Sequence, residues 1–155
     1  MERLAESELR LRSLYEESPM AYQSLDAEGR ILDVNPCWVH LFGFLREEVL
    51  GHWFGDLVVP EDRERFREFF RRFTSAGEIT GAELSIRRKD GTVAAISYDG
   101  RVARSLDGAF RCTHCLIRDV TEDRRQEAER LRFEATSRHQ QKLEAIGTLA
   151  SGVAH

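Results

Sequence analysis

The stretch that follows Val120 constrains this chain more than any other, because it contains no proline and its only glycines are Gly147 and Gly152. Such a run predicts a single helix of about thirty residues, whereas helices in globular proteins average about 11–12. A largely polar helix of this length needs a packing partner, since intrinsic helix propensity is a weak source of stability. We therefore expect a compact domain followed by a long helix that pairs with a second helix.

The spacing of residues along this helix indicates how it pairs. The residues expected to form the contact seam are Ala128, Leu131, Ala135, His139, Leu143, Ile146, Ala150 and Val153. Their steps alternate between three and four, as coiled-coil packing requires, except for two consecutive steps of four between positions 135 and 143. Such a break in heptad phase resembles a stutter, which locally changes the winding of the coil. The pattern predicts a parallel homodimer with an adjustable joint near residues 137–141.

Residues 18–120 carry the pattern of an α+β domain. The expected strands are residues 20–26, 30–34, 83–87, 93–102 and 109–120. Between the second and third strands, Asn35-Pro36 has the form of an N-cap with proline at the first helical position, and Pro60 opens a longer helix. The order ββ, helices, βββ predicts one antiparallel five-stranded sheet covered by helices on one face. Residues 1–17 are expected to form an amphipathic helix that ends before Pro19.

Composition counts against several classes of function. The 27 acidic residues exceed the 23 basic ones, which gives a formal net charge of −4. A chain without a basic field is not expected to bind nucleic acid through bulk electrostatics. The longest apolar runs, Leu57–Val59 and Val93–Ile96, are too short to cross a bilayer, so no membrane segment is expected. Three cysteines without an export signal predict a soluble, cytoplasmic protein.

Aromatic residues are the candidates for a ligand pocket in this domain. Phe66, Phe69, Phe70 and Phe73 follow helical spacing, and the arginines between them are balanced by acidic residues, which favours a solvated outer face. Rings at such spacing usually fill the core, and this is the interpretation we favour. The alternative is a ligand pocket, and its candidate lining residues are Trp38, Phe42, Trp53, Phe66, Phe70 and Tyr98.

The run Cys112-Thr113-His114-Cys115 contains residue types that bind metals. It lies in an expected strand, where alternate residues point to opposite faces, so Cys112 and Cys115 are expected to diverge. A zinc site needs two further ligands, and the sequence offers no second Cys/His pair at suitable spacing. We therefore expect no metal site and interpret these cysteines as small buried hydrophobes.

Residues 18–120 resemble a PAS domain, on the evidence of several runs in the right order and spacing. The runs are Gly29–Asn35, Leu41–Phe44, Glu47–Gly51, Arg88–Gly91 and Arg118–Glu122. The last run is similar to the Asp-Ile-Thr element that closes a PAS sheet and opens a signalling helix, here a coiled-coil linker at residues 121–141. The residues to which the resemblance assigns signal relay are Asp119, Val120, Thr121 and Glu122. The spacing of Asp119 and Glu122 also resembles a helix capping box.

A second resemblance covers residues 142–155, KLEAIGTLASGVAH, which are similar to the start of the dimerisation and phosphoacceptor helix of sensor histidine kinases. It implies that His155 accepts a phosphoryl group from ATP, bound with Mg²⁺ by a kinase domain of the complete protein, and passes it to a response regulator. At about 100° per residue, His155 faces away from the seam, as a reacting group must. Without the kinase domain, the segment is expected to be inactive.

The PAS resemblance also allows individual cofactors to be tested against residues. Photosensors of the light-oxygen-voltage type need a reactive cysteine, and the corresponding run Gly51–Leu57 has none, which excludes photoadduct chemistry. Heme-binding PAS domains need an axial histidine, whereas Phe66 occupies that place and no histidine occurs from Val58 to Ile79. A non-covalent flavin or another small ligand stays open as an alternative, although we expect a colourless protein.

The favoured function is therefore the sensory PAS module of a two-component histidine kinase. One alternative is a PAS adaptor that dimerises without any ligand. Another is a PAS module attached to a different output, such as a nucleotide cyclase, and the run from Leu143 to His155 argues against it.

Overall fold

The computed structural model describes residues 2–154, which form two units, one ending at Val120 and the other beginning at Thr121. The helices are α1 Glu2–Glu16, α2 Pro36–Phe42, α3 Arg46–Val49, α4 Arg63–Ala76 and α5 Thr121–Ala154, with short 3-10 turns at Phe54–Asp56 and Pro60–Asp62. The strands are β1 Ala21–Leu25, β2 Ile31–Val34, β3 Glu78–Arg87, β4 Val93–Arg104 and β5 Phe110–Asp119.

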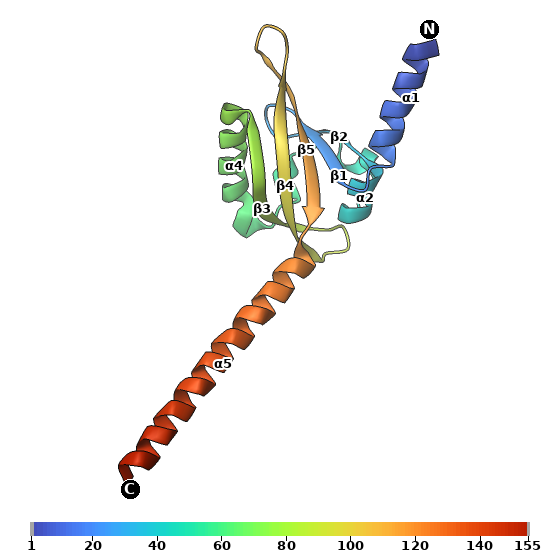
Figure 1. Ribbon diagram of the computed structural model, residues 1–155. Helices are drawn as coiled ribbons and strands as arrows, with labels where there is room; N and C mark the ends of the chain where they lie inside the picture. Colours follow the sequence, from blue (N-terminus) through green and yellow to red (C-terminus); the bar gives the residue numbers. More distant parts are fainter. Residues whose placement is uncertain (1, 155) are drawn as a thin grey trace. The chain divides into compact units, whose positions relative to one another are not determined.

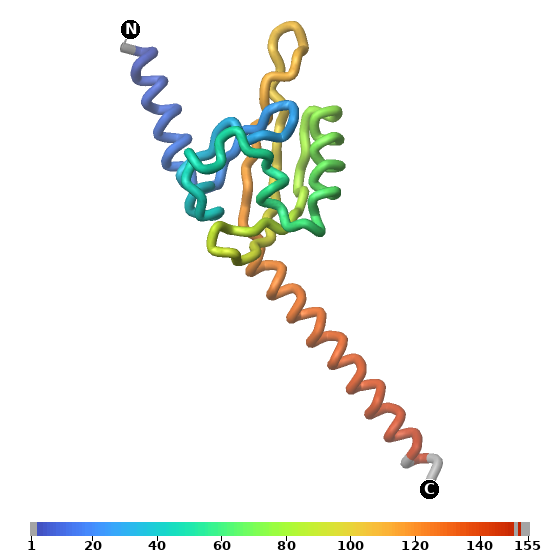
Figure 2. Tube along the Cα trace, turned by 180° about the vertical axis from the view of Figure 1, so that it is seen from behind, coloured from blue at the N-terminus to red at the C-terminus, as the bar shows by residue number. Residues whose placement is uncertain are grey.

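The first unit is built on one five-stranded antiparallel sheet whose strand order is β2-β1-β5-β4-β3 (Figure 1). The chain enters the sheet at β1, continues to the edge strand β2, leaves the sheet for the helical segment, and returns at β3 on the opposite edge. The helices between β2 and β3 lie on one face of the sheet, as the view from behind shows (Figure 2). The predicted α+β class and single five-stranded sheet are therefore confirmed.

Two element boundaries differ from the expected ones. Strand β3 begins at Glu78, directly after the helix, whereas the sequence pattern predicted residues 83–87. The pairing with β4 shifts register between Ile79 and Ala82, and this irregularity hides the alternation on which the prediction depended. Pro60 opens a 3-10 turn, and the α-helix itself begins at Arg63.

Asn35 fixes the start of α2, as the sequence predicted, and ties it to two further segments. Its Oδ1 accepts hydrogen bonds from the backbone N–H groups of Trp38, at 3.0 Å, and Tyr22, at 2.9 Å. Its Nδ2 donates to the carbonyl oxygens of Met20 and Tyr15 at 3.0 and 3.3 Å. The fully buried Asn35 side chain therefore joins α1, β1 and α2.

Replacing Asn35 with alanine is expected to lower the free energy of unfolding by about 2–4 kcal/mol, because the helix loses its cap and buried backbone groups lose their partners. Urea denaturation followed by circular dichroism measures this change. The control is Asp107→Ala, which removes a carboxylate that accepts from the Ala109 N–H in an exposed turn. A loss no larger than that of the control would contradict the role assigned to Asn35.

The core lies between the sheet and the helices and is filled mainly by aromatic and β-branched side chains. Trp38 and Phe42 are completely buried and stack with ring centroids 4.0 Å apart. On α4, Phe66 and Phe73 are buried, whereas Phe69 and Phe70 are partly exposed at the margin of the core. The expected aromatic face of this helix is confirmed, and its first and last phenylalanines are the most deeply buried in the core.

The second unit is the single helix α5, whose 34 residues confirm the long helix expected after Val120. Its charged residues pair along the helix; Arg125, for example, contacts both Glu122 and Glu129. Apolar side chains are exposed along it, including Leu143, Ile146 and Leu149. Within residues 2–154, no helix is long and apolar enough to cross a membrane.

Candidate functional site

The candidate pocket residues separate into a buried group and a group at the surface. Trp38 and Phe42 lie at the centre of the core, and the Trp38 indole N–H donates to the side-chain oxygen of Gln23 at 3.0 Å. Phe54 packs edge-on against Phe42 and against Phe66, with ring centroids 6.1 and 5.2 Å apart. These aromatic rings pack against one another and fill the core between the sheet and the helices.

Trp53, Phe66 and Phe70 border a surface hollow of about 440 Å³ beside α4. The Arg67 guanidinium stands over the Trp53 ring, 4.8 Å from its centroid. The contact screens the indole face and adds positive charge to the hollow, since cations are attracted to the faces of aromatic rings. This hollow is open to solvent, unlike the enclosed core.

Tyr98 places a polar hydroxyl group in the apolar core. It lies on β4 with only 6% of its surface exposed, and its hydroxyl has no hydrogen-bond partner within the described residues. Burial strongly raises the pKa of this phenol, so the hydroxyl stays protonated at neutral pH. A buried hydroxyl without a partner costs about 1–3 kcal/mol, and a small ligand or a water molecule that bonds to it recovers that energy.

The end of β5 is held to the loop between β3 and β4 by an ion pair. Arg88 Nη2 donates to Asp119 Oδ2 at 2.8 Å, and Arg88 Nε donates to the carbonyl oxygen of Leu41 at 3.0 Å. The neighbouring Val120 N–H donates to the carbonyl of Ala95 on β4 at 2.8 Å. The β3–β4 loop, α2, β4 and the end of β5 are therefore joined immediately before α5 begins.

Two of the predicted relay residues belong to α5. Thr121 is its first residue, and the Glu122 carboxylate accepts hydrogen bonds from Arg125 and Gln126 one turn further along the helix. The Arg125 bond lowers the pKa of Glu122, so this carboxylate is charged at neutral pH. A negative charge in the first turn of a helix stabilises it through the helix dipole.

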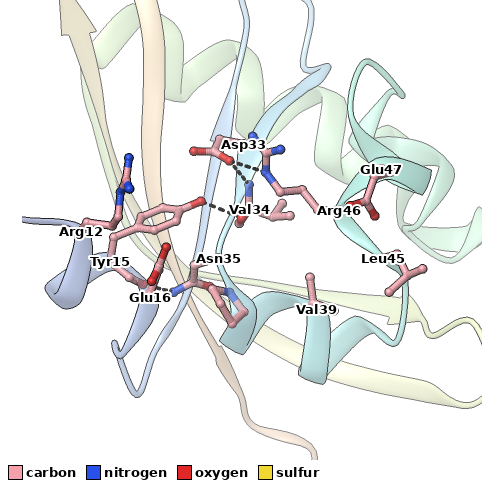
Figure 3. Close-up of a pocket in the computed structure, with 11 residues that line it drawn as sticks. Arg12, Tyr15, Glu16, Asp33, Val34, Asn35, Val39, Leu45, Arg46 and Glu47 are labelled. Atoms are coloured by element: carbon pink, nitrogen blue, oxygen red, sulfur yellow. Dashed lines mark hydrogen bonds and ion pairs between the residues drawn. The ribbon is translucent and has the colours of Figure 1, made fainter. Parts of the chain in front are cut away.

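A second hollow, of about 590 Å³, lies where the end of α1 meets β2, α2 and α3 (Figure 3). The Tyr15 hydroxyl crosses it and donates to the Val34 carbonyl oxygen at 2.6 Å. Beside it, Arg46 Nε of α3 donates to Asp33 Oδ1 of β2 at 3.0 Å. The Tyr15 bond attaches the last turn of α1 to the edge strand β2, and the Arg46 bond attaches α3 to the same strand.

Known proteins share both this architecture and its sequence pattern. A family model described as the PAS fold matches residues 9–120, which is most of the chain. The chain belongs to the PAS family. The crystal structure of the PAS domain of an HTR-like protein from Haloarcula marismortui covers 76% of this chain, and 95% of that structure is matched, with a TM-score of 0.65 and 27% identity.

Several of the similar curated proteins are sensor proteins or kinases that are much longer than this chain. Sporulation kinase E of Bacillus subtilis is 27% identical over 152 residues, which is 98% of this chain and 19% of the kinase. Sensor protein FixL of Bradyrhizobium diazoefficiens is also 27% identical over 152 residues, which is 96% of this chain and 30% of FixL. This PAS domain is therefore homologous to those of sensor histidine kinases, and the chain spans less than a third of either relative.

The packing of the PAS core bears on the ligand question. Its central rings contact one another, which favours the core-filling interpretation of Trp38, Phe42 and Phe66 over a flavin stacked between them. Tyr98 is the candidate residue that offers an unused polar group to a small ligand. The predicted phosphoacceptor, His155, lies outside the described residues.

The cysteine-rich run of the PAS domain is arranged partly as expected. Cys115 is buried and Cys112 is partly exposed, so the two diverge across β5 as predicted, but only Cys115 is the buried hydrophobe that the sequence indicated. Among the described residues, no group of three or more His, Cys, Asp or Glu side chains is placed to hold a metal ion.

Sequence reasoning did not identify Arg88 or Tyr15 as functional candidates. Arg88 is separated from Asp119 by 31 positions, and only the pairing of β4 with both β3 and β5 brings the two together. Tyr15 lies in the helix expected at residues 1–17, where a tyrosine among leucines and charged residues is the signal that points to a contact. Neither contact can be derived from local spacing.

Proposed function

We propose that this chain is the sensory input module of a two-component histidine kinase and relays a signal from its PAS core through α5 to the phosphoacceptor His155. The observation that carries this proposal is the extent of the similarity. Sensor kinases align with 96–98% of the chain, and so the alignment includes the long helix as well as the PAS domain. Since the chain matches under a third of each kinase, the complete protein would supply ATP and Mg²⁺ binding.

The proposed assembly is a parallel homodimer in the cytoplasm that donates its phosphoryl group to a response regulator. Exposed leucines on α1 support it, because Leu4, Leu9, Leu11 and Leu14 each keep at least 64% of their surface exposed in the single chain. The exposed apolar positions of α5, among them Leu143 and Ile146, add a second surface that a partner helix would bury.

The proposed relay begins at Tyr98 and ends at Asp119. Tyr98 stands opposite Ile117 in the pairing of β4 with β5, two residues before Asp119. A small ligand that bonds to the Tyr98 hydroxyl in only one of two sheet arrangements favours that arrangement by its difference in affinity. The Arg88–Asp119 ion pair then passes the change in sheet arrangement to the first residues of α5.

The unpaired Tyr98 hydroxyl favours a sensor over the alternative, an adaptor that dimerises without ligand. In an adaptor, a phenylalanine at this position would fill the same space without the cost of burying a hydroxyl. Mass spectrometry of the native purified protein distinguishes the two functions, because a sensor is expected to retain or take up a small molecule and an adaptor is not.

The experiment that tests the kinase assignment is incubation of the complete protein with radiolabelled ATP. Phosphohistidine is labile in acid and stable in base, so label with these properties in the peptide containing residues 142–155 supports the proposal. Acid-stable label, or label confined to other peptides, contradicts it. A nucleotide cyclase output would instead produce a cyclic nucleotide and no labelled protein.

Replacing Asp119 with alanine is expected to change the basal autophosphorylation of the complete protein by about 2- to 30-fold, because it removes the ion pair with Arg88 together with the expected cap of α5, and a helix cap contributes about 0.5–2 kcal/mol to a two-state balance. Label incorporation with time measures the change. The matched control is Asp33→Ala, which breaks a second arginine–aspartate pair of the PAS domain, Arg46–Asp33. Equal rates in Asp119→Ala and wild type, with and without stimulus, would contradict relay through this residue.

A further inference from the structure

Three side chains that the proposed relay does not use form a line of hydrogen-bonding groups on the sheet. His114 of β5 is exposed, and its Nδ1 lies 2.5 Å from the hydroxyl oxygen of Tyr22 on β1. The other ring nitrogen, Nε2, lies 3.7 Å from the sulfur of Cys112. Residues 112 and 114 share one face because side chains alternate along a strand. The imidazole of His114 therefore contacts the thiol of Cys112 through one ring nitrogen and the phenol of Tyr22 through the other.

This line lies on the face of the sheet opposite α4. Thr113, which lies between Cys112 and His114, is buried on the other face of the sheet, and so is Cys115. On that face, the side chains of Cys115 and of Phe73 of α4 both lie close to Gly100. Cys112, in contrast, is partly exposed. The Cys112 thiol is therefore accessible to a small reagent from solvent, whereas the Cys115 thiol is covered by the core.

Tyr22 holds the imidazole in place. Its ring stacks on that of His114 with centroids 5.9 Å apart and an interplanar angle of 28°. Tyr15 of α1 packs edge-on against the other side of Tyr22, 5.4 Å away. Burial raises the pKa of Tyr22 to about 12, so the phenol is neutral at physiological pH. In the His114 tautomer that carries its proton on Nδ1, the phenol oxygen accepts from Nδ1–H, and the lone pair of Nε2 is available to the Cys112 thiol.

We propose that Cys112 is a reactive thiol which hydroperoxides oxidise, with His114 as its base and Tyr22 as a positioning residue. The thiol proton passes to Nε2 of His114, and the thiolate sulfur attacks one peroxide oxygen. The sulfur–oxygen bond forms as the oxygen–oxygen bond breaks, and the leaving oxygen takes the proton back from His114. Cys112 becomes a sulfenic acid, and the hydroperoxide, which gains two electrons, becomes water or an alcohol.

The surroundings of the imidazole suit this chemistry. Arg101 stands directly opposite His114 on β4, so its side chain lies on the same face of the sheet as the imidazole. A hollow of about 460 Å³ next to the imidazole is also lined by Arg101, Asp99 and Glu78, so the His114 side chain stays accessible to small solutes. The arrangement of nucleophile, base and orienting group is the one that activates thiols generally.

The other two cysteines are controls within the same molecule. Cys115 is 2% exposed, and burial raises the pKa of its thiol to about 12, so it is expected to be inert. Cys37 is partly exposed, but its thiol donates to the Pro19 carbonyl oxygen at 3.4 Å, and a carbonyl cannot take the proton. The order of reactivity is therefore expected to be Cys112, then Cys37, then Cys115.

The experiment treats the folded 155-residue chain with limiting hydrogen peroxide, traps sulfenic acid with dimedone, and quantifies each cysteine-containing peptide by mass spectrometry. Iodoacetamide alkylation provides a second measure of thiol reactivity. Cys112 is expected to react at least about tenfold faster than Cys37, and His114→Ala is expected to remove that difference. Added imidazole is expected to restore part of the rate in His114→Ala, which a purely structural role of His114 would not permit.

Tyr22→Phe keeps the ring and removes the hydroxyl, and it is expected to slow Cys112 about three- to tenfold while Cys115 stays protected. His40→Gln, on α2, is the control histidine variant and is expected to leave the rate unchanged. Equal rates at Cys112 and Cys37 in the wild-type protein would overturn the proposal. So would a His114→Ala rate equal to wild type, or a loss of rate in Tyr22→Phe that is accompanied by exposure of Cys115.

Discussion

Replacing His155 with glutamine in the complete protein is expected to abolish phosphorylation from ATP. Glutamine keeps the length and polarity of the side chain but has no nucleophilic nitrogen. In the sequence, His155 follows the seam residue Ile146 by nine positions, which at about 100° per residue places it half a turn from the seam. A neutral imidazole is available at physiological pH because the unperturbed histidine pKa is about 6.5.

The matched control is His139→Gln in the same helix. His139 is an exposed residue of α5 and occupies a position of the expected seam. It is expected to retain at least half of the wild-type label, because the substitution changes packing and not the acceptor. Residual label in His155→Gln that reaches the wild-type level would mean that another residue accepts the phosphoryl group, and the kinase assignment of residues 142–155 would fail.

Replacing Trp38 with alanine is expected to destabilise the PAS domain by about 3–5 kcal/mol, which is a large part of the about 5–15 kcal/mol that stabilises a typical domain. The residue is completely buried, stacks on Phe42 and bonds to the side chain of Gln23. The substitution therefore leaves a cavity and also removes the partner of a buried amide oxygen. Thermal and urea unfolding followed by circular dichroism measure the loss.

Leu32→Ala is the control for that measurement, since Leu32 lies on β2 with 46% of its surface exposed. It is expected to change stability by about 0.5 kcal/mol or less. Trp38→Phe, which retains most of the ring volume, is expected to fall between the two variants. A loss in Trp38→Ala no greater than in Leu32→Ala would show that the aromatic stack does not hold the core together.

Local chemistry made several elements predictable. Asn35-Pro36 and the αL conformation of Gly43 set the ends of α2, and the uninterrupted run after Val120 produced one helix, α5. Each of these signals acts through residues one to four positions apart. The expected aromatic face of α4 was correct for the same reason, since Phe66 and Phe73 follow the helical repeat.

Candidate site residues were predicted less completely. The sequence placed Trp38 and Tyr98 in the domain interior, but it could not show that Trp38 is enclosed by other rings while the Tyr98 hydroxyl has no partner among the described residues. That distinction depends on how side chains from different elements pack in three dimensions. The His114 line was likewise hidden, because Tyr22 and His114 are 92 positions apart.

The element types, the single antiparallel sheet and the long helix could be predicted from the sequence, because hydrophobic period, caps and turns act over a few residues. The strand order is a property of the folded chain, in which β1 lies beside β5 and so joins the two ends of the PAS domain. The β1–β5 pairing brought Tyr22 to His114, and the pairing of β4 with both β3 and β5 brought Arg88 to Asp119. Such contacts depend on which distant strands bury each other's apolar faces, and no local pattern specifies that choice.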